Sequence, residues 1–171
     1  MFTGWYKRWV HGHGFGVHSP FAYRLVTEVL YNGGAYGYYA YELISASRKA
    51  YPTLLSDREL YLVYRILVEL RPATVGVCQS PSAPMLRHIV RLALPEAEIA
   101  ENDAEMTICD RLSHVDRDNS HLKYAYFTNP AHPALAAIWE KATRGHLYRN
   151  PARALVVLSE KLPKQEFEVK F

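Results

Sequence analysis

Hydrophobic positions near the start of the chain recur at the spacing of a helix. Ser19 followed by Pro20 is a favourable helix start, because a serine oxygen accepts from a free backbone N–H and proline fits the first turn. Apolar residues then return every three or four positions, and the Asn-Gly-Gly run at 32–34 ends the pattern. The sequence therefore predicts a first helix between Pro20 and this run.

Two more helices are expected in the first half of the chain. One covers about 39–50. The next begins at Ser56 and Glu59, whose spacing is that of a capping box, and carries apolar residues on one face until Pro72. Residues 1–71 are therefore interpreted as a helical N-terminal extension.

After Pro72 the pattern changes to short apolar runs, which are typical of buried strands. Ala73–Cys78 and Ala97–Ala100 flank a helix with apolar residues at 85–92. A strand–helix–strand unit of this length places its two strands in parallel with a right-handed crossover. Later in the chain the pattern predicts strands over 122–127, 154–158 and 164–171 and a helix over 133–143.

A stretch rich in acidic residues separates the early strands from the late ones. Between 96 and 118, eight carboxylates stand against two arginines, a balance typical of a solvated surface segment. We therefore expect this stretch to be irregular and the sheet to have about five strands. Residues 159–163 are expected to close an antiparallel hairpin between the last two strands.

The composition limits the classes of protein to which the chain can belong. Its 171 residues are 49% hydrophobic and 22% charged, which suits one domain with an extension. A net charge of +3 does not indicate nucleic-acid binding. No apolar run reaches membrane-spanning length, and two cysteines, Cys78 and Cys109, are too few for a disulfide framework. We expect a soluble, reduced, cytoplasmic protein without a membrane partner.

The N-terminal end holds clustered histidines and aromatic residues. His11, His13 and His18 could ligate a metal, but no carboxylate or thiolate stands nearby, and packing around the first helix is favoured. The aromatic and basic cluster 5–9 could meet a membrane surface or single-stranded nucleic acid. We favour a subunit interface, giving a homodimer or a complex with another protein, because amphipathic tyrosines add to this end at 31, 36, 38, 39 and 41.

Two segments carry a resemblance to a known family. The opening His11–Phe21, with Tyr38–Tyr41, resembles the front of class I S-adenosylmethionine-dependent methyltransferase-like proteins of Bacteroidetes, and 155–171 is similar to their last two strands. The resemblance implies an α/β fold: a trimmed Rossmann-like sheet of about five strands over 72–171, with an N-terminal helical extension and a C-terminal antiparallel hairpin. The acidic segment would replace units deleted from the complete core.

The cofactor loop of that family has lost its key residues in this chain. In the family, the first core strand ends in an acid and a glycine-rich turn, which lets the backbone approach the cofactor. Carried over, the acid falls on Gly76 and the two glycines on Cys78 and Ser82. Two prolines in the loop through Ser80 also remove N–H donors. These departures from the family's pattern therefore argue against ordinary cofactor binding.

Other family positions are only partly filled. Glu101 stands where an acid would hold the ribose hydroxyls, although a surface carboxylate is the simpler interpretation. Where metal-dependent relatives offer a carboxylate, this chain has Thr-Asn-Pro at 128–130, so no metal is expected. Cys78 could act as a nucleophile with His88, but without a third group a buried, inert thiol is favoured. The vestigial cofactor positions are therefore Cys78, Ser80, Ser82 and Glu101.

These observations leave three hypotheses for function. The first is a pseudoenzyme: a methyltransferase-like domain that has lost catalysis and acts as a binding or interaction module, with no cofactor. The second is an active S-adenosylmethionine-dependent methyltransferase with an atypical cofactor loop. The third is a structural dimerisation protein joined through its N-terminal helices. We rank the first ahead of the other two, and whether the chain is an enzyme stays open.

Overall fold

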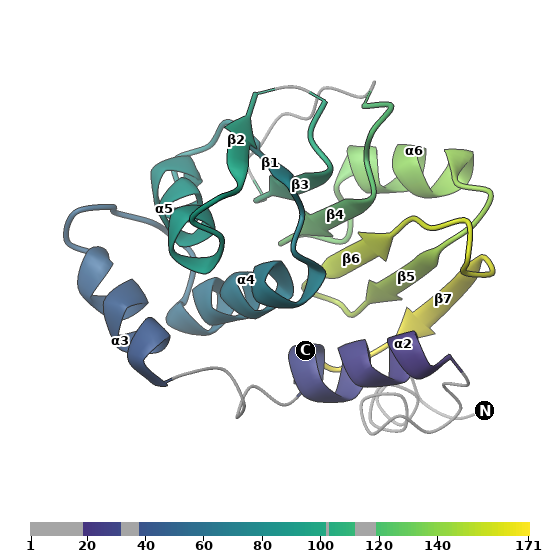
Figure 1. Cartoon of the computed structure of the whole chain (residues 1–171), viewed down its shortest axis with the longest axis horizontal. Helices are drawn as coiled ribbons and strands as arrows, with labels where there is room; N and C mark the ends of the chain where they lie inside the picture. The colour runs from purple at the N-terminus through teal and green to yellow at the C-terminus, as the bar shows by residue number, and fades with distance from the viewer. Residues whose placement is uncertain (1–18, 32–37, 102, 112–118) are drawn as a thin grey trace.

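The chain folds around one mixed β-sheet with helices packed on it (Figure 1). The computed structural model describes residues 19–31, 38–101, 103–111 and 119–171. None of the helices in these ranges is long and apolar enough to cross a membrane. They are α2 (Pro20–Arg24), which continues as the π-helix η1 (Leu25–Tyr31), then α3 (Tyr38–Ser47), α4 (Asp57–Leu70), α5 (Ala83–Ala93) and α6 (Pro133–Lys141).

The described residues form a seven-stranded sheet in the order β2-β1-β3-β4-β6-β5-β7. The strands are β1 (Thr74–Val77), β2 (Glu98–Ala100), β3 (Met106–Cys109), β4 (Tyr124–Phe127), β5 (His146–Arg149), β6 (Ala154–Val157) and β7 (Gln165–Glu168). The predicted β1–α5–β2 unit is confirmed, because β1 and β2 pair in parallel. Only β6 runs against its neighbours β4 and β5, so the other strands end at one common edge.

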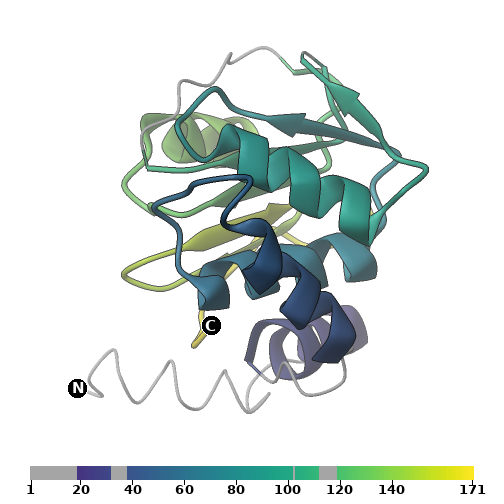
Figure 2. The same cartoon turned by 90° about the vertical axis from the view of Figure 1, so that its left-hand side faces the viewer.

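Helices cover both faces of the sheet, so the fold has three layers (Figure 1 and Figure 2). On the first face, one core cluster joins α2, η1, α4 and α5 to the strands, with Ile66 and Leu86 fully buried. On the second face, α6 packs Leu135 onto a smaller cluster. The adjacent residues Leu155 and Val156 belong to different clusters, as the alternation of a strand requires. The helices of the N-terminal extension and the strands of the sheet therefore pack into the same, larger hydrophobic core.

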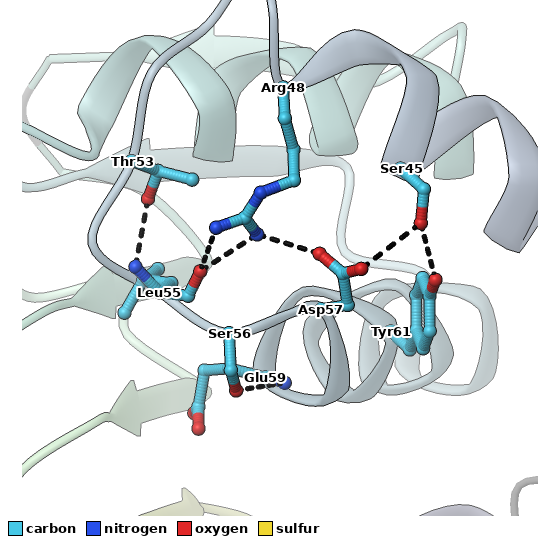
Figure 3. Close-up of polar contacts among 8 residues, drawn as sticks. All are labelled: Ser45, Arg48, Thr53, Leu55, Ser56, Asp57, Glu59 and Tyr61. Carbon is cyan, nitrogen blue, oxygen red and sulfur yellow. Dashed lines mark hydrogen bonds and ion pairs between the residues drawn. The ribbon is translucent and has the colours of Figure 1, made fainter.

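A polar cluster attaches α3 to the first turn of α4 (Figure 3). Arg48 donates to the Asp57 carboxylate at 2.7 Å and to the Leu55 carbonyl at 2.9 Å. Ser45 donates to the other Asp57 oxygen at 3.3 Å and lies 2.6 Å from the Tyr61 hydroxyl. The two helices are thus joined by side chains that α4 presents near its start.

The two predicted helix starts are confirmed. The Ser19 hydroxyl accepts from the Ala22 N–H and the Ser56 hydroxyl from the Glu59 N–H, each at 3.3 Å. The first helix differs from the expectation in its winding, since it becomes a π-helix at Leu25. The capping box at α4 is only half formed, because the Glu59 carboxylate accepts from the Tyr126 hydroxyl and the Arg153 guanidinium.

The expectation that residues 96–118 are irregular is wrong for part of that stretch. Met106–Cys109 form β3, which lies between β1 and β4. Met106, Ile108 and Cys109 are fully buried. The carboxylates on both sides of this four-residue strand concealed it in the sequence. With β5 also unpredicted, the sheet has seven strands instead of about five.

The predicted hairpin between the last two strands is also wrong. β6 pairs with β5, and β7 lies on the far side of β5, parallel to it. Asn150 makes the tight β5–β6 connection, because its side-chain oxygen accepts from the Ala152 and Arg153 N–H groups at 2.8 and 2.9 Å. At the start of β5, Gly145 has φ +129°, and a Cβ there would lie 2.3 Å from the Val157 oxygen. The glycine at position 145 therefore allows the backbones of β5 and β6 to approach this closely.

Candidate functional site

The candidate site lies at the edge where the parallel strands β1, β3 and β4 end. Because these strands are neighbours, the residues that follow them, Cys78, Asp110 and Thr128, come to the same edge. Glu101 follows β2 beside them, and its side chain is exposed. Ligands of parallel α/β sheets bind beyond the carboxyl ends of the strands. The predicted cofactor positions therefore share the edge at which a ligand is expected.

Two thiols meet at this edge. The β1–β3 register pairs Val77 with Ile108, so Cys78 stands opposite Cys109. The Cys78 N–H donates to the Ile108 carbonyl at 3.0 Å, and the two Sγ atoms are 2.8 Å apart. Cys109 is fully buried and Cys78 half-buried. The sequence did not predict this pair, because Cys109 ends a four-residue strand enclosed by carboxylates.

Three hydroxyl-bearing residues, Ser80, Ser82 and Thr128, follow β1 and β4 at the same edge of the sheet. Ser82 is 2% exposed at the start of α5, and its side chain makes no capping hydrogen bond. The hydroxyl oxygens of Ser80 and Thr128 are buried and have no hydrogen-bond partner among the described residues. Buried polar atoms normally have a partner. The Ser80 and Thr128 hydroxyls are therefore, with the exposed Glu101 carboxylate, polar groups at this edge that could meet a ligand.

The backbone of the loop between β1 and α5 offers few donors. The Cys78 N–H is bonded to β3, and the Ala83 N–H donates to the Ser80 carbonyl at 3.1 Å. Pro81 and Pro84 have no N–H at all. Anion-binding helix starts depend on such N–H groups, so the beginning of α5 is a poor cradle for a phosphate or carboxylate.

Gly76, where the resemblance to methyltransferase-like proteins predicts an acid, lies within β1 and is buried. A Cβ built on it would lie 3.2 Å from the Ala104 Cβ, closer than an ordinary contact. An acidic side chain here would require the chain between β2 and β3 to move. The packing of Gly76 against Ala104 is therefore incompatible with the family's acid unless that connection shifts.

His88 does not serve Cys78 as a base. Its Nε2 lies 2.8 Å from the Ser47 hydroxyl, and its ring stacks on Tyr51 with centroids 4.6 Å apart. Partial burial, followed by the charge of Arg91, lowers the pKa of the imidazole. His88 therefore contributes to the contact between α5 and α3, and the nucleophile hypothesis finds no support in its placement.

The segment after β4 is organised around helix capping. The Asn129 side-chain oxygen accepts from the Ala131 N–H at 3.0 Å. His132 Nδ1 accepts from the Ala134 N–H at 3.2 Å at the start of α6. In the described ranges, no group of three or more His, Cys, Asp and Glu side chains is arranged to hold a metal ion.

Three cavities lined by described residues lie away from the predicted cofactor positions. The largest, about 470 Å³, opens at the opposite edge of the sheet beside Arg71 and Pro95. A second, about 330 Å³, lies beside the ends of β5 and β7. A third, about 190 Å³, is lined in part by Arg58, Arg65 and Arg153. None of these three is lined by Cys78, Ser80, Ser82 or Glu101.

The predictions for the N-terminal end fall partly outside the described residues. His11, His13, His18, the cluster 5–9 and Tyr36 lie outside them. Of the remaining aromatic residues, Tyr41 stacks on Tyr61 with centroids 4.2 Å apart. Exposed apolar side chains on α2 and α3 are Phe21, Tyr23, Tyr39 and Leu43.

No protein-family model, curated protein or solved structure matches this chain.

Proposed function

We propose that this chain is a degenerate methyltransferase-like domain that no longer transfers methyl groups and acts as a binding or interaction module. The mostly parallel sheet, its β1–α5–β2 unit and the antiparallel β6 are compatible with a Rossmann-like core of the kind that the resemblance implies. Seven strands make the sheet more complete than the sequence suggested. Loss of cofactor binding would then arise in the loop after β1 rather than from missing strands.

The observation that carries the proposal is the shortage of backbone donors after β1. A nucleotide-type cofactor is held by N–H groups of a glycine-rich turn and of the first helical turn. In this loop two prolines have no N–H, and the N–H groups of Cys78 and Ala83 bond within the protein. Side chains at the two glycine positions, Cys78 and Ser82, further separate the backbone from a ligand.

Exposed aromatic residues on α2 and α3 support a role in binding another protein. Tyr39 is 71% exposed and Tyr23 49%, and Phe21 and Leu43 are exposed to a lesser degree. A tyrosine ring can bury apolar area at an interface while its hydroxyl keeps a hydrogen bond. The partner would be a second copy of the chain or a different protein.

An active methyltransferase with an atypical loop is the alternative, and one observation favours it. Glu101 is exposed at the same edge as the buried Ser80 and Thr128 hydroxyls, which have no partner among the described residues. A carboxylate near the end of β2 and unpaired hydroxyls near β1 and β4 could bind the ribose and another polar part of a cofactor.

Calorimetric titration of the full chain with S-adenosylmethionine and S-adenosylhomocysteine separates these two functions. We expect no heat of binding up to millimolar ligand, with circular dichroism verifying that the protein is folded. Micromolar binding of either compound would overturn the proposal in favour of the active enzyme. Glu101→Gln is the matched variant in that case, since it removes the charge while keeping the size of the side chain.

Light scattering coupled to gel filtration tests the interaction surface. If a second copy is the partner, the chain elutes as a dimer and the double variant Tyr23→Ser/Tyr39→Ser as a monomer. Leu54→Ser is the control, because Leu54 is 82% exposed but precedes α4, outside the surface on α2 and α3. A monomeric wild-type chain would exclude the dimerisation hypothesis and direct the search to a different protein.

A further inference from the structure

The two cysteines of the chain are held face to face by the sheet. Cys78 directly follows β1 and Cys109 ends β3, and the parallel register places them opposite one another. The hydrogen bond from the Cys78 N–H to the Ile108 carbonyl extends the strand pairing to this position. Opposed residues of neighbouring strands point to the same face, and the Sγ atoms accordingly lie 2.8 Å apart.

The two thiols differ in their access to solvent. Cys109 is fully buried in the second-face cluster, with Phe127 and Ala125 of the neighbouring strand. Cys78 is only half-buried, at the edge where β1 ends. The partial exposure of Cys78 therefore gives a small oxidant access to it from solvent, whereas Cys109 has no exposed surface.

We propose that Cys78 and Cys109 form a reversible dithiol–disulfide site oxidised by hydroperoxides. The Cys78 thiol first gives its proton to solvent, and the thiolate attacks one peroxide oxygen, forming an S–O bond as the O–O bond breaks. The departing hydroxide (or alkoxide) takes up a proton from solvent and is released as water (or an alcohol), and Cys78 remains as a sulfenic acid. The Cys109 sulfur then attacks the Cys78 sulfur, the S–O bond breaks, and the released hydroxide takes the Cys109 proton to form water. Two thiols lose two electrons, and the peroxide gains them.

Cys78 is thus the reacting thiol and Cys109 the resolving thiol, an arrangement set by their unequal burial. The disulfide joins β1 to β3 at the candidate ligand edge and closes a loop that contains α5 and β2. A dithiol reductant restores both thiols by exchange, so the site responds to redox conditions even in a reducing compartment. The proposal does not depend on whether S-adenosylmethionine binds.

Mass spectrometry of the full chain after treatment with hydrogen peroxide tests the site. The protein is reduced, treated, freed of peroxide with catalase, and alkylated under denaturing conditions. We expect the intact mass to fall by two hydrogen atoms with no alkyl group added, a peptide pair linked through Cys78 and Cys109, and full reversal by dithiothreitol. Two alkylated cysteines after treatment, or a linkage only between separate copies, would overturn the proposal.

Two single variants test the order of the steps, each checked for folding by circular dichroism. In Cys109→Ala the resolving thiol is absent, so a sulfenic acid accumulates on Cys78 and is trapped by dimedone. In Cys78→Ala we expect oxidation of Cys109 to be at least about tenfold slower than oxidation of Cys78 in the wild type, because burial protects a thiol. Equal rates would refute the assignment of roles, and the wild-type experiment remains decisive if a variant fails to fold.

Discussion

The first turn of α4 carries two polar clusters that differ mainly in burial. Toward α3, Asp57 pairs with Arg48 at 2.7 Å, and their side chains remain 45% and 34% exposed (Figure 3). Toward the sheet, Glu59 pairs with Arg153 at 2.5 Å, and their side chains are only 9% and 14% exposed. Two residues apart on one helix, the same kinds of groups therefore meet in different surroundings.

The inner cluster also includes Tyr126, a fully buried residue of β4 that donates its hydroxyl to Glu59. Burial, and then the negative charge of Glu59, raise the pKa of Tyr126 well above 10. The phenol therefore stays protonated and remains a donor at any pH near neutral. Because its side chains are almost fully buried, the inner cluster should determine how α4 sits on the sheet, while the outer cluster only positions α3.

Breaking the inner ion pair gives the largest expected effect. Glu59→Leu leaves a buried guanidinium without its partner, and Arg153→Met leaves a buried carboxylate, so each should lower the free energy of unfolding by about 3–5 kcal/mol. The double variant should lose much less unfolding free energy than the sum of the losses in the two single variants. Urea denaturation of all four proteins measures this cycle, and a single-variant cost below about 1 kcal/mol would contradict the burial argument.

Removing one hydroxyl from each cluster sharpens the comparison. Tyr126→Phe deletes a buried hydrogen bond to a charged group, and we expect a loss of about 1.5–3 kcal/mol. Tyr61→Phe deletes the part-buried contact with Ser45, at 2.6 Å, and should cost about 0.5–1 kcal/mol. Both changes keep the aromatic ring, so the difference in unfolding free energy reports the burial of the hydroxyl and the charge of its partner. Equal costs would show that the two environments are alike.

The sequence predicts α4 well but not the role of Glu59. Ser56 and Glu59 have the spacing of a capping box, which correctly locates the start of the helix. That spacing cannot reveal that the Glu59 carboxylate faces an arginine 94 residues later, because such a contact depends on how β6 enters the sheet. Local periodicity predicts the helix, whereas contacts between residues far apart in the sequence can be assigned only once the strand order is known.

The candidate site was predictable to a similar extent. Cys78 and Glu101 could be assigned to one edge, because the β1–α5–β2 unit makes their strands parallel. Cys109 could not be placed beside Cys78, since it ends a four-residue strand enclosed by carboxylates. In the strand order, β1 lies between β2 and β3. Because β3 is the neighbour of β1 on the inner side of the sheet, Cys109 at the end of β3 lies beside Cys78.

The helix cap between the two clusters has an intermediate effect. Ser56 accepts from the Glu59 N–H at 3.3 Å, and Ser56→Ala should reduce the free energy of unfolding by about 1 kcal/mol. Ser56→Asp is the matched control, because an aspartate oxygen can also cap and should preserve stability to within about 0.5 kcal/mol. Urea denaturation distinguishes the two, and equal losses in both variants would mean that the hydroxyl itself, rather than capping, is needed.

The outer ion pair has the smallest expected effect, and its response to salt separates it from the inner pair. In a double-mutant cycle of Arg48→Met and Asp57→Asn, we expect a coupling energy of about 0.2–1 kcal/mol at low ionic strength. Both side chains are more than a third exposed, so solvent ions should screen the pair, and the coupling should shrink further in about 1 M salt. The Glu59–Arg153 coupling should depend less on salt, because the two side chains are only 9% and 14% exposed. If the Arg48–Asp57 coupling energy exceeded about 2 kcal/mol and did not change with salt, exposure would not determine the strength of these two clusters.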